Sequence, residues 1–272
     1  MFETLSRSAD IVKKSFQVLL SEKKLLLFPA ISGLALIALI ISFIFPIIFI
    51  SESEDLSTAL TLLFYFLAYF LIIFFNSALI HAASNKIDGK NVAIGESISF
   101  ALSKIVNIII WSAIAATVGV ILSILRGNAD KQRGVGAIVG AIVISIIGMA
   151  WSFATFFVVP VIIFENLSPF AAIKKSIELI KKSWGESIAG GFGISAVFFI
   201  LYLLGIGLGV LLFLSKAGFG LTLGLIIPYF ILVFLAQNTL DGIFVAALYK
   251  FATTGKTTIF SNEELQGAFK KA

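Results

Sequence analysis

Residues 173–184, with the sequence IKKSIELIKKSW, place apolar and charged positions on different faces of a predicted helix. Ile173, Ile177, Ile180 and Trp184 follow one another at intervals of three or four residues, so they form one helical stripe. Lysines cover most of the remaining surface. A related segment, IVKKSFQVLLSEKK, occupies residues 11–24. The pattern predicts two amphipathic helices, each with a basic polar face.

Most of the other segments are apolar over long distances. Residues 25–51 and 187–215 contain no charged side chain, and each run exceeds the ~20 residues that cross a hydrocarbon core. Only 13% of the 272 residues are charged, against about 25% in a soluble domain. We therefore predict an all-α, polytopic membrane protein. The six expected spans cover about residues 25–50, 56–83, 104–125, 135–163, 187–214 and 220–249.

The basic residues favour one set of connectors. Sixteen of the 20 Lys and Arg residues lie before the first span, at 84–104, at 164–186 and in the tail from residue 250. The positive-inside rule places these segments, and both termini, in the cytoplasm, with the short turns outside an inner (cytoplasmic) membrane. This placement accounts for the net charge of +5, so we expect no nucleic-acid partner.

The connectors also indicate an internal repeat of an amphipathic helix, a span, a short turn and a returning span. The three hairpins give pseudo-repeats 1–83, 84–163 and 164–249 within a single membrane domain. Residues 12–19 align with residues 173–180, while the middle copy at 93–111 is weaker. Its predicted stripe is Ile94, Ile98, Ala101, Ile105 and Ile108. The tail, 250–272, contains a short predicted helix that opens with a Ser261-x-x-Glu264 capping box.

The amphipathic helices suit the surface of a bilayer, with the apolar stripe among acyl chains and the lysines among anionic headgroups. The alternative is that these helices only fix the entry of the following span. The candidate headgroup-binding residues are Lys13, Lys14, Lys174, Lys175, Lys181 and Lys182.

Polar side chains inside predicted spans gather towards the cytoplasmic ends. The candidate intramembrane polar site comprises Asn76, His81, Asn107, Gln237, Asn238 and Asp241. These groups either bind neighbouring helices or line an inward-open vestibule for water, a cation or a headgroup. Glycine pairs at four-residue spacing predict close helix contacts at Gly136/Gly140, Gly205/Gly209 and Gly220/Gly224.

The sequence lacks the groups of familiar enzyme sites. With no cysteine and one histidine, it offers neither a thiolate nor a histidine cluster for a metal. No phosphate-binding loop or G-x-S-x-G motif occurs, and the hydrophilic segments are too short for a catalytic domain. We expect no enzyme activity, no metal and no cofactor.

The segment SADIVKKSFQVLLSEKKLLLFPAISGL (residues 8–34), read with the six spans, resembles a family of uncharacterised prokaryotic six-helix membrane proteins. The chain is also similar, more loosely, to the membrane domain attached to some glycerophosphodiester phosphodiesterases. The resemblance implies the fold class. It carries over no activity and no catalytic residues, because the phosphodiesterase domain has no counterpart here.

Two functions follow as hypotheses. The first is a non-catalytic protein that handles lipids, organises the membrane or serves as a subunit or scaffold of a membrane complex. Its partners would be anionic lipids, a second protein or another copy of the chain. The alternative is a transporter or channel that uses the polar site in the cytoplasmic half of the spans.

Overall fold

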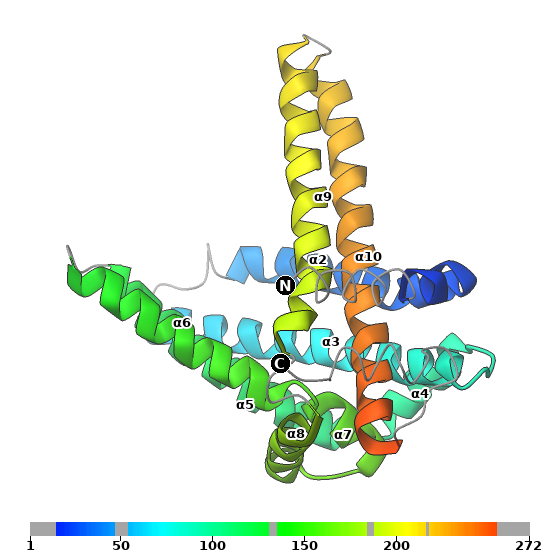
Figure 1. Ribbon diagram of the computed structural model, residues 1–272. Helices are drawn as coiled ribbons and strands as arrows, with labels where there is room; N and C mark the ends of the chain where they lie inside the picture. Colours follow the sequence, from blue (N-terminus) through cyan, green and yellow to red (C-terminus); the bar gives the residue numbers. More distant parts are fainter. Residues whose placement is uncertain (1–14, 47–53, 131–134, 184–187, 216–217, 255–272) are drawn as a thin grey trace. The chain divides into compact units, whose positions relative to one another are not determined.

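A computed structural model describes residues 15–46, 54–130, 135–183, 188–215 and 218–254 (Figure 1). Residues 15–21 are helical. The elements that follow are η1 (Lys23–Leu26), α2 (Leu27–Phe45), α3 (Glu54–Ile87), α4 (Ile94–Leu102), α5 (Ile105–Asp130), α6 (Val135–Thr155), α7 (Val158–Glu165), α8 (Pro169–Ser183), α9 (Ile188–Leu214) and α10 (Phe219–Thr254).

Six described stretches are long and apolar enough to cross a membrane. They are Lys23–Ile44, Asp55–Ile87, Ile105–Gly127, Gly136–Glu165, Ile194–Leu214 and Phe219–Thr254. The predicted all-α polytopic fold is therefore confirmed. The predicted tail helix at 261–272 lies outside the described residues, and the three-fold repeat stays a prediction.

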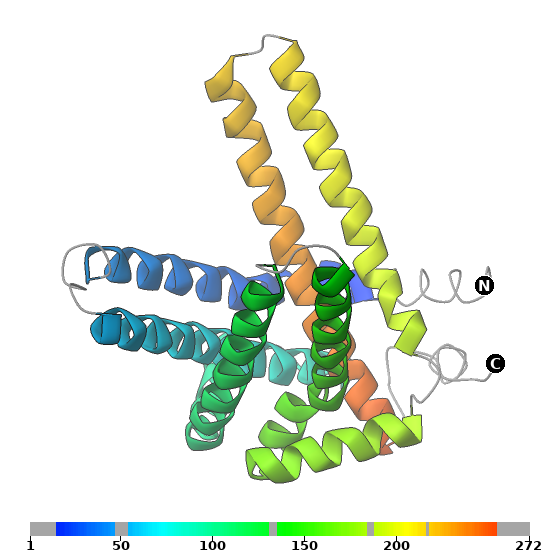
Figure 2. The same cartoon turned by 90° about the vertical axis from the view of Figure 1, so that its left-hand side faces the viewer.

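The chain divides into two compact units. The first, which we call the α5–α6 unit, comprises Ile31–His81 and Ile94–Lys182. The second, the α9–α10 unit, comprises Met1–Ala30, Ala82–Ala93 and Ser183–Ala272. Each unit contains one pair of long helices that run side by side (Figures 1 and 2).

Aromatic contacts and a glycine organise the α5–α6 unit. Trp111 of α5 stacks on Trp151 of α6, with 5.9 Å between ring centroids. Gly119 lies against the side chain of Tyr69 on α3, and a Cβ atom at residue 119 would collide with the phenol ring. Small residues are favoured where membrane helices approach closely, which explains a glycine at this position of α5.

A proline breaks the fourth span into two helices. Pro160 lies inside the fourth predicted span, and the structure places the break at Phe156 and Phe157, between α6 and α7. Proline has no N–H, so the carbonyl of Phe156 cannot receive the usual bond from the residue four positions later. At the same break, the N–H of Phe157 is donated to Ser176 Oγ on α8, at 3.0 Å. The break thereby becomes an attachment point for α8.

The α9–α10 pair is held by a buried glycine and a tyrosine. A Cβ atom at Gly205 would collide with the rings of Tyr229 and Phe230. The hydroxyl of Tyr229 donates to the carbonyl of Leu201 at 2.7 Å. The close contact predicted at Gly205 is confirmed. The contact predicted at Gly220 and Gly224 is wrong within the described residues, because open space surrounds both positions.

The end of α3 is closed by a glycine turn. Gly89 has a left-handed φ of 73°, and the N–H groups of Gly89 and Lys90 return to the carbonyls of Lys86 and Asn85. This arrangement is a Schellman motif, in which glycine takes the conformation that other residues adopt at a cost. The motif leaves Asp88 at the C-terminal cap of α3.

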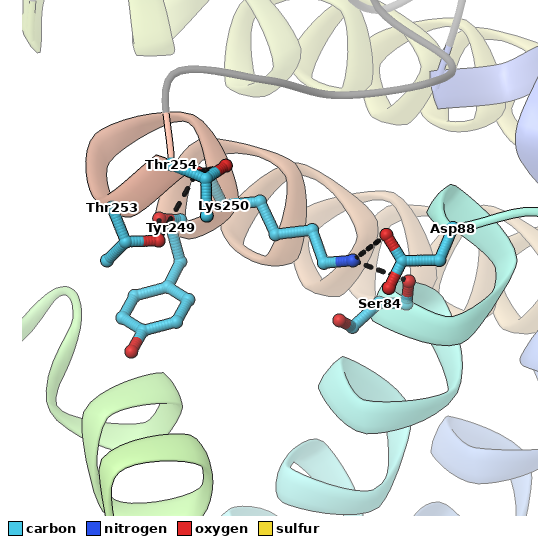
Figure 3. Close-up of polar contacts among 6 residues, drawn as sticks. All are labelled: Ser84, Asp88, Tyr249, Lys250, Thr253 and Thr254. Atoms are coloured by element: carbon cyan, nitrogen blue, oxygen red, sulfur yellow. Dashed lines mark hydrogen bonds and ion pairs between the residues drawn. The ribbon is translucent and has the colours of Figure 1, made fainter.

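Two ion pairs fasten the ends of helices in the α9–α10 unit. Lys250 of α10 pairs with Asp88 and also donates to the carbonyl of Ser84 at 3.1 Å (Figure 3). A carboxylate at a helix C-terminus opposes the helix dipole, and the ammonium group of Lys250 offsets this repulsion. Lys86 pairs with Glu22 at 3.5 Å. Segments from three distant parts of the sequence are joined in this way.

Replacing Gly205 by leucine is expected to destabilise the α9–α10 pair, since the new side chain must displace two aromatic rings. Overpacking of this kind costs about 1–3 kcal/mol. Gly207→Leu is the matched control, because nothing lies within 4 Å of a Cβ at that position. Thermal unfolding in detergent, followed by circular dichroism, should show a lower midpoint for Gly205→Leu alone. Equal midpoints for the two variants would contradict the packing described.

Candidate functional site

The six polar residues of the predicted intramembrane site are divided between the two units. Asn76, His81 and Asn107 belong to the α5–α6 unit. Gln237, Asn238 and Asp241 lie on α10 in the other unit. The contacts of each group are therefore given within its own unit.

His81 joins α3 to α4. Its ring is buried, with 9% of the residue exposed, and Nδ1 shares a hydrogen bond with Ser97 Oγ at 3.1 Å. The imidazole stacks on Phe100, with 4.0 Å between ring centroids and 17° between planes. Both partners lie on α4, so the histidine fixes this short helix against the end of α3. Its geometry is that of a packing residue.

Asn76 and Asp241 lie equally far along two long helices, one in each unit. Each lies about 33 Å from the first residue of its helix, at 1.5 Å per residue. A hydrocarbon core is about 30 Å thick, so a span that enters at Glu54 or Phe219 leaves the core near these residues. A span with these entry points would place both side chains near a membrane boundary. Asn76 and Asn107 are half-buried within their own unit.

The α10 group is organised by a residue that sequence reasoning missed. The hydroxyl of Tyr202 on α9 donates to Gln237 Oε1 at 2.9 Å, and Asp241 follows Gln237 by one helical turn. Asn238 donates to the carbonyl of Phe234 in its own helix at 2.8 Å. In this group Gln237 makes the described contact between helices, and the role predicted for Asn238 stays a prediction.

Asp241 is exposed on the surface of its unit. It forms no ion pair with a described residue. At the boundary of a membrane its carboxylate can contact water and headgroups, where an ionised group costs less than at the bilayer centre. Among the residues that the structure describes, no three His, Asp or Glu side chains gather in a way that could hold a metal ion.

Helix α8 buries a different face from the predicted apolar stripe. Its buried residues are Pro169, Ala172, Ser176 and Leu179. Ile173, Ile177 and Ile180 are half-buried, beside this contact face. The predicted isoleucine stripe therefore lies beside the face that α8 packs against its neighbours, and Trp184, its last member, lies outside the described residues. Ser176, which aligns with Ser15 in the sequence, lies at the centre of the packing contact. Its hydroxyl oxygen accepts a hydrogen bond from the N–H of Phe157.

The middle amphipathic segment is shorter than the sequence predicts. Helix α4 ends at Leu102, and Ser103 and Lys104 form a turn before α5. The predicted stripe from Ile94 to Ile108 is therefore wrong as one helical face, since it is divided between two helices. In this turn, Lys104 donates a hydrogen bond to Asn166 Oδ1 at 3.0 Å. Asn166 follows the last residue of α7 and has a left-handed conformation, with φ of 54°.

The three amphipathic segments share a buried serine. Ser15, Ser97 and Ser176 are each at most 1% exposed. Ser97 bonds to His81 and Ser176 to the Phe157 N–H, whereas the oxygen of Ser15 has no partner in the described chain. Serine at the fourth place of the sequences VKKS (12–15), IGES (94–97) and IKKS (173–176) is the signal that could have identified these packing contacts.

The predicted headgroup-binding lysines are only partly described. Lys174 and Lys181 are exposed on α8, and Lys175 lies 3.7 Å from Glu178. Lys182 belongs to α8, but its side chain is outside the described part of the structure. Lys13 and Lys14 lie outside the described residues. Among the described residues, Lys174 and Lys181 form a basic surface on α8, on the side opposite its contact with α7.

Comparison with known proteins gives one family. A family model described as "Family of unknown function (DUF6159)" matches residues 55–259, about three quarters of the chain. No curated protein and no solved structure matches the chain. The resemblance to a family of uncharacterised membrane proteins is confirmed, while nothing supports the looser resemblance to the membrane domain of glycerophosphodiester phosphodiesterases. The chain belongs to the DUF6159 family.

Proposed function

We propose that the protein is a non-catalytic component of the cytoplasmic membrane that binds anionic lipids through its amphipathic helices. Both termini lie in the cytoplasm in this proposal, and lipid binding serves lipid handling, membrane organisation or the scaffolding of a membrane complex. The exposed face of α8 carries the proposal. Lipid is the partner that this face fits best.

The orientation of α8 supports contact with a membrane surface. In Figure 2 the yellow-green helix α8 runs crosswise to α5 and α6, which belong to the same unit. If α5 and α6 cross a bilayer, α8 therefore lies parallel to the bilayer surface. Helices of this kind bind with apolar residues among the acyl chains and basic residues among the headgroups.

The side chains of α8 are distributed accordingly. Phe170 is 68% exposed, and Lys174 and Lys181 lie on the same side of the helix. The half-buried Ile177 borders this side and extends its apolar edge. Each lysine near an anionic surface contributes about 1 kcal/mol of attraction. Glu178 on the exposed side reduces the attraction, so the two lysines determine the sign of the interaction.

Neutralising Lys174 and Lys181 as the double variant Lys174→Gln/Lys181→Gln is expected to remove the preference of α8 for anionic lipid. The native chain has no cysteine, so Phe170→Cys provides a single site for an environment-sensitive dye. The full-length protein is placed in vesicles that contain brominated phosphatidylglycerol or brominated phosphatidylcholine. The ratio of quenching by the two lipids should fall by up to about thirtyfold in the double variant, because two favourable charges are lost.

Glu178→Gln is the matched control for this experiment. It alters an exposed charge on the same helix and should maintain or increase the preference for phosphatidylglycerol. An unchanged quenching ratio in the lysine variant would contradict electrostatic headgroup binding by α8.

One observation favours transport as the second candidate function. Tyr202, Gln237 and the exposed Asp241 form a polar surface where α9 and α10 leave the predicted hydrocarbon region. A carboxylate at this position can accept a proton or a cation. The surface lies within the α9–α10 unit and does not require α8.

If this second candidate is correct, Asp241→Asn should abolish ion flux, since the amide carries no titratable charge. Proton movement is measured with a pH-sensitive dye inside proteoliposomes under a sodium gradient. Asn238→Ala is the control, because Asn238 bonds only to its own helix among the described residues. Flux that is absent from the unmodified protein, or that persists in Asp241→Asn, would exclude a carboxylate-dependent transporter of protons or sodium.

A further inference from the structure

A crevice of about 420 Å³ opens between α3, α5 and α6 of the α5–α6 unit. This volume falls in the range of about 300–1,000 Å³ that is typical of ligand pockets. The lining residues that matter for its chemistry are Tyr69, Gly119, Arg126, Ser145, Gly148 and Ser152. The headgroup-binding face proposed for α8 contributes no residue to it.

Small residues create the open space. Gly119 accommodates Tyr69 on one wall, while a Cβ atom at Gly148 would have only Leu122 within 4 Å, at 3.9 Å. A larger side chain at residue 148 would therefore occupy the crevice rather than collide with a neighbouring helix. The space is a consequence of glycine and serine at these positions of α5 and α6.

The two serine hydroxyls in the crevice wall already have hydrogen-bond partners in their own helix. The hydroxyl of Ser145 donates to Ala141 in its own helix at 2.8 Å, and that of Ser152 donates to Gly148 at 3.0 Å. Hydroxyl groups satisfied within their own helix can border apolar atoms without losing a hydrogen bond. The interior thus accepts methylene groups.

The shape and charge of the crevice are those of a site for one amphiphile. Along α5 the lining extends from Ala115 to Arg126, a length of about 16 Å at 1.5 Å per residue. Arg126 is exposed at one end and pairs with no described carboxylate. An arginine near a helix end reaches the interface, where its planar guanidinium group binds phosphate oxygens in a bidentate manner.

We propose that this crevice holds one acyl chain of an anionic phospholipid, with the lipid phosphate bound by Arg126. The acyl chain lies along α5 and α6, against the small residues, and the headgroup stays at the membrane boundary beside the end of α5. The site is at the opposite end of α5 from α4, α7 and α8. It is therefore independent of the headgroup-binding surface proposed for α8, and each can fail alone.

A neighbouring groove without a charged side chain shows why the anionic headgroup is assigned to the crevice that contains Arg126. A space of about 450 Å³ between α3 and α5 is lined by Ser57, Thr58, Thr61, Tyr65, Ser123 and apolar residues, without a charged side chain. Its volume is similar to that of the crevice, but it offers nothing to bind a phosphate. This groove is an internal reference for lipid contact without headgroup recognition.

The test uses phosphatidylglycerol with a photoactivatable diazirine in one acyl chain, and the full-length protein in vesicles. After illumination, labelled peptides are identified by mass spectrometry. The crevice-lining residues Ala115, Gly119 and Leu122 of α5 and the segment 145–152 of α6 should be labelled several-fold more than Leu211 and Leu232, which are 66% and 65% exposed on α9 and α10. The same probe built on phosphatidylcholine should label the crevice less, and the uncharged groove equally.

Two variants separate the chain from the headgroup. Gly148→Leu should fill the crevice and lower its labelling several-fold, while Gly127→Leu, where nothing lies within 4 Å of the Cβ, should leave it unchanged. Arg126→Gln should reduce the preference for phosphatidylglycerol over phosphatidylcholine by about tenfold, the effect of losing a charge-assisted hydrogen bond. Arg126 is exposed, so this variant does not depend on core packing.

Labelling of the crevice at the level of Leu211 and Leu232, or labelling unaffected by Gly148→Leu, would overturn the proposed acyl-chain site. A phosphatidylglycerol preference that survives in Arg126→Gln would overturn the assignment of Arg126 to the phosphate. Neither result bears on α8, whose dye-quenching experiment monitors a different part of the unit.

Discussion

The structure depends on one constraint: within a hydrocarbon core about 30 Å thick, each backbone N–H and C=O must find its partner inside the protein. Helices meet this requirement by themselves, which accounts for the six apolar helical stretches of the described chain. The two longest helices exceed the thickness of the core by the widest margin, since α3 is about 51 Å long and α10 about 54 Å. Their surplus length carries the polar groups, and Lys250 and Asp88 pair there.

Where the helical bonding fails, a side chain replaces it. The proline at residue 160 interrupts the fourth span, and the hydroxyl of Ser176 receives the N–H of Phe157. The same hydrogen bond holds α8 crosswise to α5 and α6, which belong to its unit. A disruption required by proline chemistry thereby positions the helix to which we assign lipid binding. The crevice has a related origin, because glycine and serine that permit close helix packing also leave space between the helices.

The sequence predicts the spans well because hydrophobic length is a property of the chain alone. The partner of each polar residue depends on which helices meet, and one sequence does not contain that information. Periodicity therefore placed the isoleucines of α8 on one stripe but could not identify Ser176 as the centre of its contact face. Likewise, Gln237 was recognised as a polar residue in a span, but its partner Tyr202 was not. The prediction for α4 was too long, because the hydrophobic pattern continues through the turn at Ser103 into α5.

The central proposal is that six crossings place both termini and the longer basic connectors on the cytoplasmic side. The absence of native cysteine permits a direct measurement with Ser53→Cys, Asn128→Cys and Lys90→Cys, each introduced alone. A membrane-impermeant maleimide is applied to intact cells and, separately, after permeabilisation. The account predicts labelling of residues 53 and 128 in intact cells and of residue 90 only after permeabilisation. Labelling of residue 53 or residue 128 from the same side as residue 90 would contradict it.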